Sequence, residues 1–214
     1  VFNGEVYNFK ELRKELERLG HVFRSHSDTE IMLGCIETWG LEKAVKRFVG
    51  MFAFGLWDKK ERQLHLVRDR MGEKPLYFGR AGRTFLFSSE LKALRAHPDF
   101  KAEINRDALA LYLRHNYIPA PYSIYEDVYK LPPGTILTVQ SKNINQLSNP
   151  IPYWSAKVAA EEGIISPFVG SEREAVSHLD SLLRNVIRHQ MIADVPLGAF
   201  LSGGLDSSTV VALM

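Results

Sequence analysis

The sequence predicts a mixed α+β fold over about the first two-thirds of the chain and the start of an α/β unit over the last third. Two observations indicate the first part: amphipathic helices near the start, and several apolar strand segments that follow one another with short polar turns between them. One observation indicates the second part: a long amphipathic helix is followed by an apolar segment and then a turn rich in glycine and serine.

The chain opens with the end of a strand at Val1-Phe2, which we expect to enter a turn at Asn3-Gly4. A helix is predicted from Phe9 to Leu19, with Asn8 as N-cap and Glu11 at the capping-box position. A second helix, Thr29–Trp39, follows a cap at Ser27 or Asp28 and is ended by Gly40.

Strands dominate the middle of the chain. Met51–Asp58 is almost entirely apolar, which is typical of a strand covered on both faces. The other elements expected here are a strand at Gln63–Arg68, a hairpin of Leu76–Gly79 and Thr84–Ser88, helices at Ser89–Ala96 and Arg106–His115, and a strand at Thr135–Val139.

The composition changes at Ser141–Pro152, where Ser, Asn and Pro gather in either a linker or a surface loop. Ser171 and Glu174 then form a capping box for a helix that reaches about Met191. Its expected buried face is Val176, Leu179, Leu183, Val186 and Ile187, and a buried strand is expected at Leu197–Leu201.

Composition excludes several classes of function. The 214 residues are 45% hydrophobic and 24% charged with a net charge of +2, which gives no general case for nucleic acid or an anionic membrane. No apolar run reaches the about 18 residues that cross a bilayer. The single cysteine, Cys35, forms no internal disulfide, and a cytoplasmic location is the simplest interpretation. Both ends lie inside patterns, so we expect an internal piece of a longer protein.

The turn after the last apolar segment has the layout of an anion-binding loop. In Ser202-Gly203-Gly204-Leu205-Asp206-Ser207-Ser208, glycines let backbone N–H groups converge, and a helix N-terminus follows. It fits neither the P-loop pattern nor the nucleophile-elbow pattern. The plain alternative is a helix cap at Asp206 or Ser207.

This loop resembles the pyrophosphate loop of N-type ATP pyrophosphatases, in the form found in glutamine-hydrolysing asparagine synthetases. The rest of the chain is similar to that family from end to end. The segments that carry the resemblance are Phe2–Asn8, Ser27–Glu30, Gly50–Phe54, Arg68–Tyr77, Ser88–Leu94 and Asp194–Gly198.

The resemblance implies two domains. Residues 1–150 would form a class II glutamine amidotransferase of the N-terminal-nucleophile type, a four-layer αββα sandwich that releases ammonia from glutamine. Residues 151–214 would begin a parallel-sheet ATP pyrophosphatase domain, in which ATP adenylates aspartate and ammonia displaces AMP to give asparagine. The family often forms homodimers, and the sequence leaves this open.

For the glutamine site, the resemblance assigns Asn3 and Gly4 to the oxyanion hole, and Glu5 and Asp28 to the substrate's α-ammonium group. The alternatives are an Asn-Gly hairpin turn, a solvated strand glutamate and a helix cap. The family's nucleophilic cysteine and its carboxylate-binding arginine are not in the chain. Cys35 lies on the inward face of a predicted helix, which indicates a buried structural thiol.

For the nucleotide site, the resemblance places the ATP phosphates on the loop and Mg²⁺ on the carboxylate of Asp206. For Phe200 and Leu201, the two apolar residues on the strand expected before the loop, a place in the core of a sheet is an equally simple role. The ATP-binding residues implied are Phe200, Leu201, Ser202, Gly203, Gly204, Asp206, Ser207 and Ser208.

The charged segment Arg68-Asp69-Arg70 with Lys74 is expected to be a salt-bridged turn with a structural role. The seven histidines show no metal-ligand spacing. Two other functions remain open. One is a related amidotransferase with a different carboxylate acceptor, of the β-lactam synthetase or polysaccharide-cluster kind. The other is a glutamine-binding module without catalysis.

Overall fold

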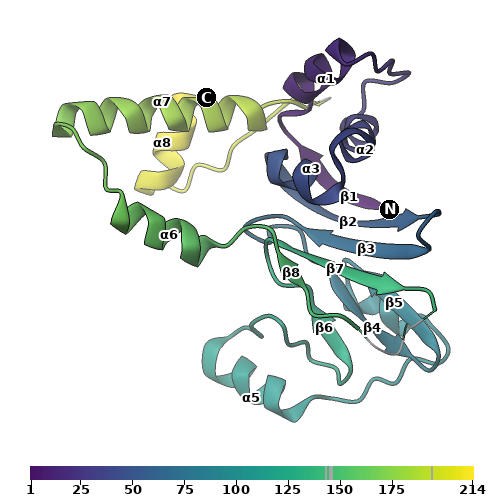
Figure 1. Ribbon diagram of the computed structural model, residues 1–214. Coiled ribbons are helices and arrows are strands. Elements are labelled where there is room, and N and C mark those ends of the chain that lie inside the picture. Colours follow the sequence, from purple (N-terminus) through teal and green to yellow (C-terminus); the bar gives the residue numbers. More distant parts are fainter. Residues whose placement is uncertain (143, 145–146, 194) are drawn as a thin grey trace.

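The computed structural model describes residues 1–142, 144, 147–193 and 195–214. Its centre is two antiparallel sheets. Helices α1, α2 and α3 cover the face of the larger sheet that is turned away from the smaller sheet (Figure 1). The last three helices, α6, α7 and α8, lie to one side of the sheets (Figure 1). The predicted α+β class is confirmed for the first part of the chain.

The larger sheet has the strand order β1-β2-β3-β7-β8, and every neighbouring pair is antiparallel. Its strands are β1 (Phe2–Val6), β2 (Gly50–Asp58), β3 (Gln63–Arg68), β7 (Thr135–Gln140) and β8 (Ile151–Pro152). The register Gly4↔Phe52 sets β1 at the edge of the sheet beside β2. Among the described residues, strand β1 therefore has a sheet neighbour on one side only.

The smaller sheet has the order β5-β4-β6 and packs against the larger one. Its strands are β4 (Tyr77–Ala81), β5 (Thr84–Ser88) and β6 (Val128–Lys130), so the predicted hairpin is confirmed. Gly55 of β2 is needed for this packing, because a Cβ there would lie 2.7 Å from the ring of Phe87. The apolar residues of β2 thus contact a layer on each face, as its composition predicts.

Helices α1 (Phe9–Arg18), α2 (Asp28–Trp39) and α3 (Leu41–Arg47) form the outer layer (Figure 1). Their buried residues meet Phe52 and Phe54 of β2 in one core cluster. The sequence did not predict α3, a seven-residue helix. Helices α4 (Leu91–Arg95) and α5 (Arg106–His115) match their predicted positions, and α5 lies below the sheets in the view of Figure 1.

One local prediction at the start of the chain is wrong, and two are confirmed with a difference in detail. Asn3-Gly4 is not a turn, because β1 runs through it. Asn8 is the N-cap residue of α1, as predicted, but its side chain makes no capping bond. Instead its amide donates to the carbonyl of Arg47 and accepts from the N–H of Val49. Of the two caps predicted for α2, Ser27 is the one observed, and its side chain accepts from the N–H of Thr29. For Asn8 and Asp28, a tertiary partner took the side chain that local rules had assigned to a cap.

Of the two interpretations of Ser141–Pro152, the structure favours the surface loop. Ile151–Pro152 is strand β8, and Tyr153 beyond it is 8% exposed and packs in the main core. The phenol of Tyr153 donates to the carbonyl of Arg68 at 2.8 Å. Asn143, Asn145 and Gln146 of this segment lie outside the described residues.

The C-terminal third contains α6 (Ala156–Ile165), α7 (Glu172–Gln190) and α8 (Leu205–Leu213). The Ser171–Glu174 capping box is confirmed. The predicted burial of one face of α7 is wrong, since Val176, Leu179 and Val186 are 62%, 55% and 42% exposed, and Leu183 and Ile187 are only half-buried. Periodicity identifies the apolar face of a helix but not what covers it.

The strand predicted at Leu197–Leu201 is also wrong, because this segment is not extended in any sheet. Strands are stable only when they pair, and no strand among the described residues runs beside this one. The parallel sheet predicted to begin here is therefore not formed. Asp194, which begins the family-like segment Asp194–Gly198, lies outside the described residues.

Candidate glutamine site

A cavity of about 450 Å³ opens between β1 and the start of α2. Its lining includes the two carboxylates predicted to bind an ammonium group, Glu5 and Asp28. They are 23 positions apart in the sequence, and the structure brings them to one cavity. The other lining residues are Val6, Tyr7, Phe9, His26, Ser27, Ile192 and Ala193.

The side chain of Asp28 is held in place by the edge strand. Its Oδ2 accepts a hydrogen bond of 2.9 Å from the backbone N–H of Val6, and Thr29 Oγ1 donates to its Oδ1 at 3.4 Å. This explains why Asp28 does not cap its own helix: the N–H of the strand is the better-placed donor. The carboxylate keeps acceptor capacity for a ligand, because two oxygens offer about four lone-pair sites.

The cavity has a negative environment. Burial raises the pKa of Tyr7, and the nearby charges of Glu73, Glu5 and Asp69 raise it further. Each of these carboxylates disfavours a phenolate and, by the same electrostatics, favours a cation. The arrangement suits a ligand that carries an ammonium group.

Asn3 and Gly4 do not line this cavity, although both precede Glu5 on β1. Nδ2 of Asn3 donates to Oγ of Ser89 at 2.9 Å, which joins two of the family-like segments. Gly4 has φ +149°, and a Cβ there would lie 2.1 Å from the carbonyl oxygen of Met51. Only glycine fits at this position, which gives it a backbone role whatever its part in chemistry.

Cys35 is a buried structural thiol, as predicted. It is fully buried in the main core, and burial raises its pKa from 9.0 to about 11. Nucleophilic cysteines have lowered pKa values because the thiolate is the reactive form. Cys35 therefore does not supply a nucleophile.

The charged segment Arg68–Lys74, which begins at the last residue of β3, has a structural role, but the predicted salt bridges do not hold it in place. No ion pair joins its members among the described residues. Arg68 donates to the carbonyls of Gly72, Lys74 and Leu131. The fully buried carboxylate of Asp69 accepts from the backbone N–H groups of Phe52, Glu73 and Lys74. These bonds fix the loop that brings Glu73 towards Tyr7.

The loop predicted to bind phosphate lies at the start of α8. Oγ of Ser202 lies 2.9 Å from Oγ of Ser207, and Gly203 has φ +80°. The N-cap is Gly204, so the alternative of a cap at Asp206 or Ser207 is wrong. Phe200 is fully exposed and Leu201 is 62% exposed, so neither forms sheet core or a pocket wall here.

The residues of this loop fit a phosphate group and a hard cation. In the described part of the chain, no side chain caps α8, so N–H groups of its first turn keep capacity for an anion. The carboxylate of Asp206 and the hydroxyls of Ser202, Ser207 and Ser208 are oxygen ligands of the kind Mg²⁺ prefers. Among the described residues, no three His, Cys, Asp or Glu side chains are grouped as a metal site.

Residues 1–154 match the family described as glutamine amidotransferase domain, and the chain belongs to this family. Residues 178–214 match the family described as asparagine synthase, so the start of that domain follows. The resemblance that the motifs indicated is thereby confirmed.

Similar proteins support the same family assignment. Asparagine synthetase [glutamine-hydrolyzing] 3 of Bacillus subtilis is 37% identical over 100% of this chain and 33% of its own length. A putative asparagine synthetase [glutamine-hydrolyzing] 2 of Methanocaldococcus jannaschii is 38% identical over 100% of this chain and 39% of its own. Amidase chry2 of Gibberella zeae is 30% identical over 100% and 30%. The chain thus spans about a third of the length of these relatives.

Solved structures support the fold alone. The glutamine phosphoribosylpyrophosphate amidotransferase of B. subtilis, complexed with ADP and GMP, has a TM-score of 0.50 at 18% identity, covering 72% of this chain and 28% of that one. A structure described as the allosteric regulatory enzyme of purine biosynthesis has a TM-score of 0.50 at 19% identity, covering 71% and 27%. Separately, no described helix is long and apolar enough to cross a membrane.

Sequence reasoning missed several members of the site. Tyr7, His26 and Ser27 line the cavity, and Glu73 contributes to its charge. Glu73 and Ser27 lie inside the family-like segments Arg68–Tyr77 and Ser27–Glu30, and this position could have marked them as members of the site. His26 had none, because a single polar residue in a loop is typical of a solvated surface.

Proposed function

We propose that this chain is part of a glutamine-hydrolysing asparagine synthetase, which takes ammonia from glutamine and uses ATP to convert aspartate to asparagine. The observation that carries the proposal is the meeting of Glu5 and Asp28 in one cavity within a fold of the glutamine amidotransferase family. The asparagine synthase match at the end of the chain supports the second half of the reaction.

In the glutaminase step, Glu5 and Asp28 bind the α-ammonium group of glutamine. Asn3 and the N–H of Gly4 stabilise the oxyanion of the tetrahedral intermediate. Asn3 can do so while bonded to Ser89, because an amide nitrogen carries two hydrogens. A cysteine thiolate other than Cys35 attacks the amide, ammonia leaves, and water releases glutamate from the acyl-enzyme.

In the synthetase step, Ser202–Ser208 bind the ATP phosphates that leave as pyrophosphate, and Asp206 helps to hold Mg²⁺. Phe200 and Leu201 border the nucleotide once their segment is covered. ATP supplies the leaving group that activates the aspartate carboxylate for attack by ammonia. The free N–H groups at the start of α8 support this assignment.

We further propose the domain division that the family implies. Residues 1–150 form the four-layer αββα glutaminase, to which β8 and Tyr153 add the last contacts, and residues 151–214 begin the ATP pyrophosphatase domain. We propose a cytoplasmic location. A related enzyme with another carboxylate acceptor is the second candidate, and it is favoured by the match to an amidase over the whole chain.

The test is a product assay on the complete protein, with glutamine or ammonium as nitrogen donor and a panel of carboxylate acceptors. We expect pyrophosphate and AMP to form with aspartate as acceptor. ADP and phosphate as products would contradict the phosphate-loop assignment, and turnover with another acceptor alone would select the second candidate. If the complete protein makes the product with ammonium but not with glutamine as nitrogen donor, that result would argue against the glutamine site.

A further inference from the structure

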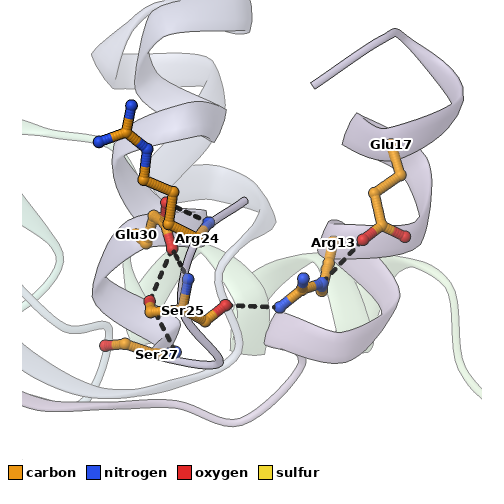
Figure 2. A network of polar contacts seen from close by, with 6 residues as sticks. All are labelled: Arg13, Glu17, Arg24, Ser25, Ser27 and Glu30. Atoms are coloured by element: carbon orange, nitrogen blue, oxygen red, sulfur yellow. Dashed lines mark hydrogen bonds and ion pairs between the residues drawn. The ribbon is translucent and has the colours of Figure 1, made fainter. Parts of the chain in front are cut away.

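One carboxylate, that of Glu30, makes three hydrogen bonds to the loop that forms one wall of the glutamine cavity. Oε1 of Glu30 accepts from the N–H of Arg24 at 3.0 Å, and Oε2 accepts from the N–H of Ser25 at 2.8 Å and its hydroxyl at 2.6 Å. Figure 2 shows these bonds, with the guanidinium of Arg24 pointing away from the network. Glu30 thus fastens residues 24–25 to helix α2.

The same loop is tied to helix α1 from its other side. Nη1 of Arg13 donates to the carbonyl of Ser25 at 2.8 Å, and its Nε donates to Glu17 at 2.8 Å (Figure 2). The guanidinium also lies 5.3 Å from the ring centre of Phe23, which suits a cation–π contact. Ser25 is therefore bound between two helices.

A short chain of hydrogen bonds leads from Glu30 to the cavity. The hydroxyl that Glu30 fixes, Ser25 Oγ, accepts from the N–H of Ser27 at 3.2 Å. Ser27 Oγ in turn caps α2 at the N–H of Thr29, which sets the backbone at Asp28. Ser27 and Asp28 both line the cavity, whereas Glu30 does not.

We propose that Glu30 is a positioning residue for glutamine. It holds residues 24–28 in the conformation in which Asp28 meets the α-ammonium group, and it touches no substrate itself. The inference rests on the proposed glutamine site and adds to it the device that orders one wall. The hydrogen bonds of the network join residues 13–30 only, so the Ser202–Ser208 loop takes no part in it.

The chemistry of the network favours a charged carboxylate. Three hydrogen bonds lower the pKa of Glu30 to about 2, so it is ionised throughout the working range. A glutamine at this position would place its NH₂ donor against a backbone N–H in either orientation, that of Arg24 or that of Ser25. The loop would then lose at least one charge-assisted bond and spend part of its time in other conformations.

The test is Glu30→Gln in the complete protein, with Glu37→Gln as control. Glu37 is exposed on the same helix, so the control matches the change in charge. We expect the KM for glutamine to rise about five- to tenfold, because apparent affinity falls with the fraction of ordered loop. The kcat and the ammonium-driven reaction should stay within about twofold of wild type, since the loop touches no reacting atom. Amide exchange at Ser25 and Ser27 should quicken.

A second variant, Arg13→Met, keeps an apolar stem over Phe23 and removes the donors, and it should give the same pattern. An unchanged KM in Glu30→Gln, or equal losses in the glutamine- and ammonium-driven reactions, would overturn the inference. Unchanged amide exchange would overturn it too, and that readout needs no glutamine. A wild-type protein that uses ammonium but not glutamine would instead contradict the proposed function.

Discussion

Replacing Asp28 by asparagine tests the glutamine site most directly, because it removes a charge and keeps the shape. The asparagine Oδ1 can still accept from the N–H of Val6, the bond that now measures 2.9 Å. Any loss of glutamine affinity in this variant therefore reports the carboxylate charge. The fold should be unaffected.

The expected loss follows from electrostatics. Two opposite unit charges about 4 Å apart attract by about 4 kcal/mol near a protein surface and by about 1 kcal/mol in bulk water. Asp28 is half-buried in an open cavity and Glu5 remains beside it, so an intermediate value of about 1.5–2 kcal/mol is appropriate. At 1.36 kcal/mol per factor of ten, the KM for glutamine should rise about 10- to 30-fold.

Asp28→Ala separates the charge from the hydrogen bond. It removes both, and it leaves the N–H of Val6 without its acceptor, which costs about 1–3 kcal/mol of folding stability. Urea denaturation should therefore distinguish alanine from asparagine, while the two raise the KM alike. Asp107→Asn is the matched control, because Asp107 is also an acidic residue in the first turn of a helix but lies on α5.

The assay compares glutamine-driven with ammonium-driven synthesis in the same preparation. Ammonium bypasses the glutamine cavity, so its rate should not change in Asp28→Asn. A KM for glutamine equal to that of Asp107→Asn would refute the assignment of Asp28. A fall in the ammonium-driven rate would show that the substitution acts on the fold instead.

Three further predictions concern the backbone, the nucleotide loop and the core. Gly4→Ala should destabilise the fold by about 3 kcal/mol or more, measured by urea unfolding, because its Cβ would overlap the Met51 carbonyl. Gly20→Ala, at φ +94° with open space around it, should cost only about 1 kcal/mol, and equal costs would contradict the overlap argument. Asp206→Ala should abolish pyrophosphate release and leave glutamine hydrolysis intact; parallel loss of both would contradict separate sites. Stability should fall as pH rises from 9 to about 11, because the Cys35 thiol ionises first in the unfolded chain, and Cys35→Ala should remove that part of the dependence.

Local sequence signals predicted the elements whose stability is decided nearby. The capping box at Ser171 and Glu174, the cap at Ser27 and the β4–β5 hairpin all depend on contacts within a few residues. The apolar composition of β2 was informative for a different reason: a strand covered on both faces is apolar along its whole length, so its own residues reveal the coverage. These features follow from the chain alone.

Predictions failed where a distant segment decided the outcome. The side chain of Asn8 looks like a cap until the backbone at Arg47 and Val49 competes for its amide. The segment at 197–201 has the composition of a buried strand, but a strand forms only beside a partner. For the site, Glu5 and Asp28 could be named from family-like motifs. The role of Glu30 could not, because it depends on where Arg24 and Ser25 turn back onto α2.

The contacts also indicate how the glutamine cavity and the Ser202–Ser208 loop should each depend on the rest of the fold. Asp28 is bonded to β1, β1 is paired with β2, and β2 is central to both core clusters. The glutamine cavity is thus continuous with the most buried part of the molecule. The loop at Ser202–Ser208 is exposed, and the bonds that hold it join its own members. Perturbations of the sheet, such as Gly4→Ala, should therefore impair glutamine binding first, whereas the conformation of the phosphate loop should respond to what covers α7 and α8.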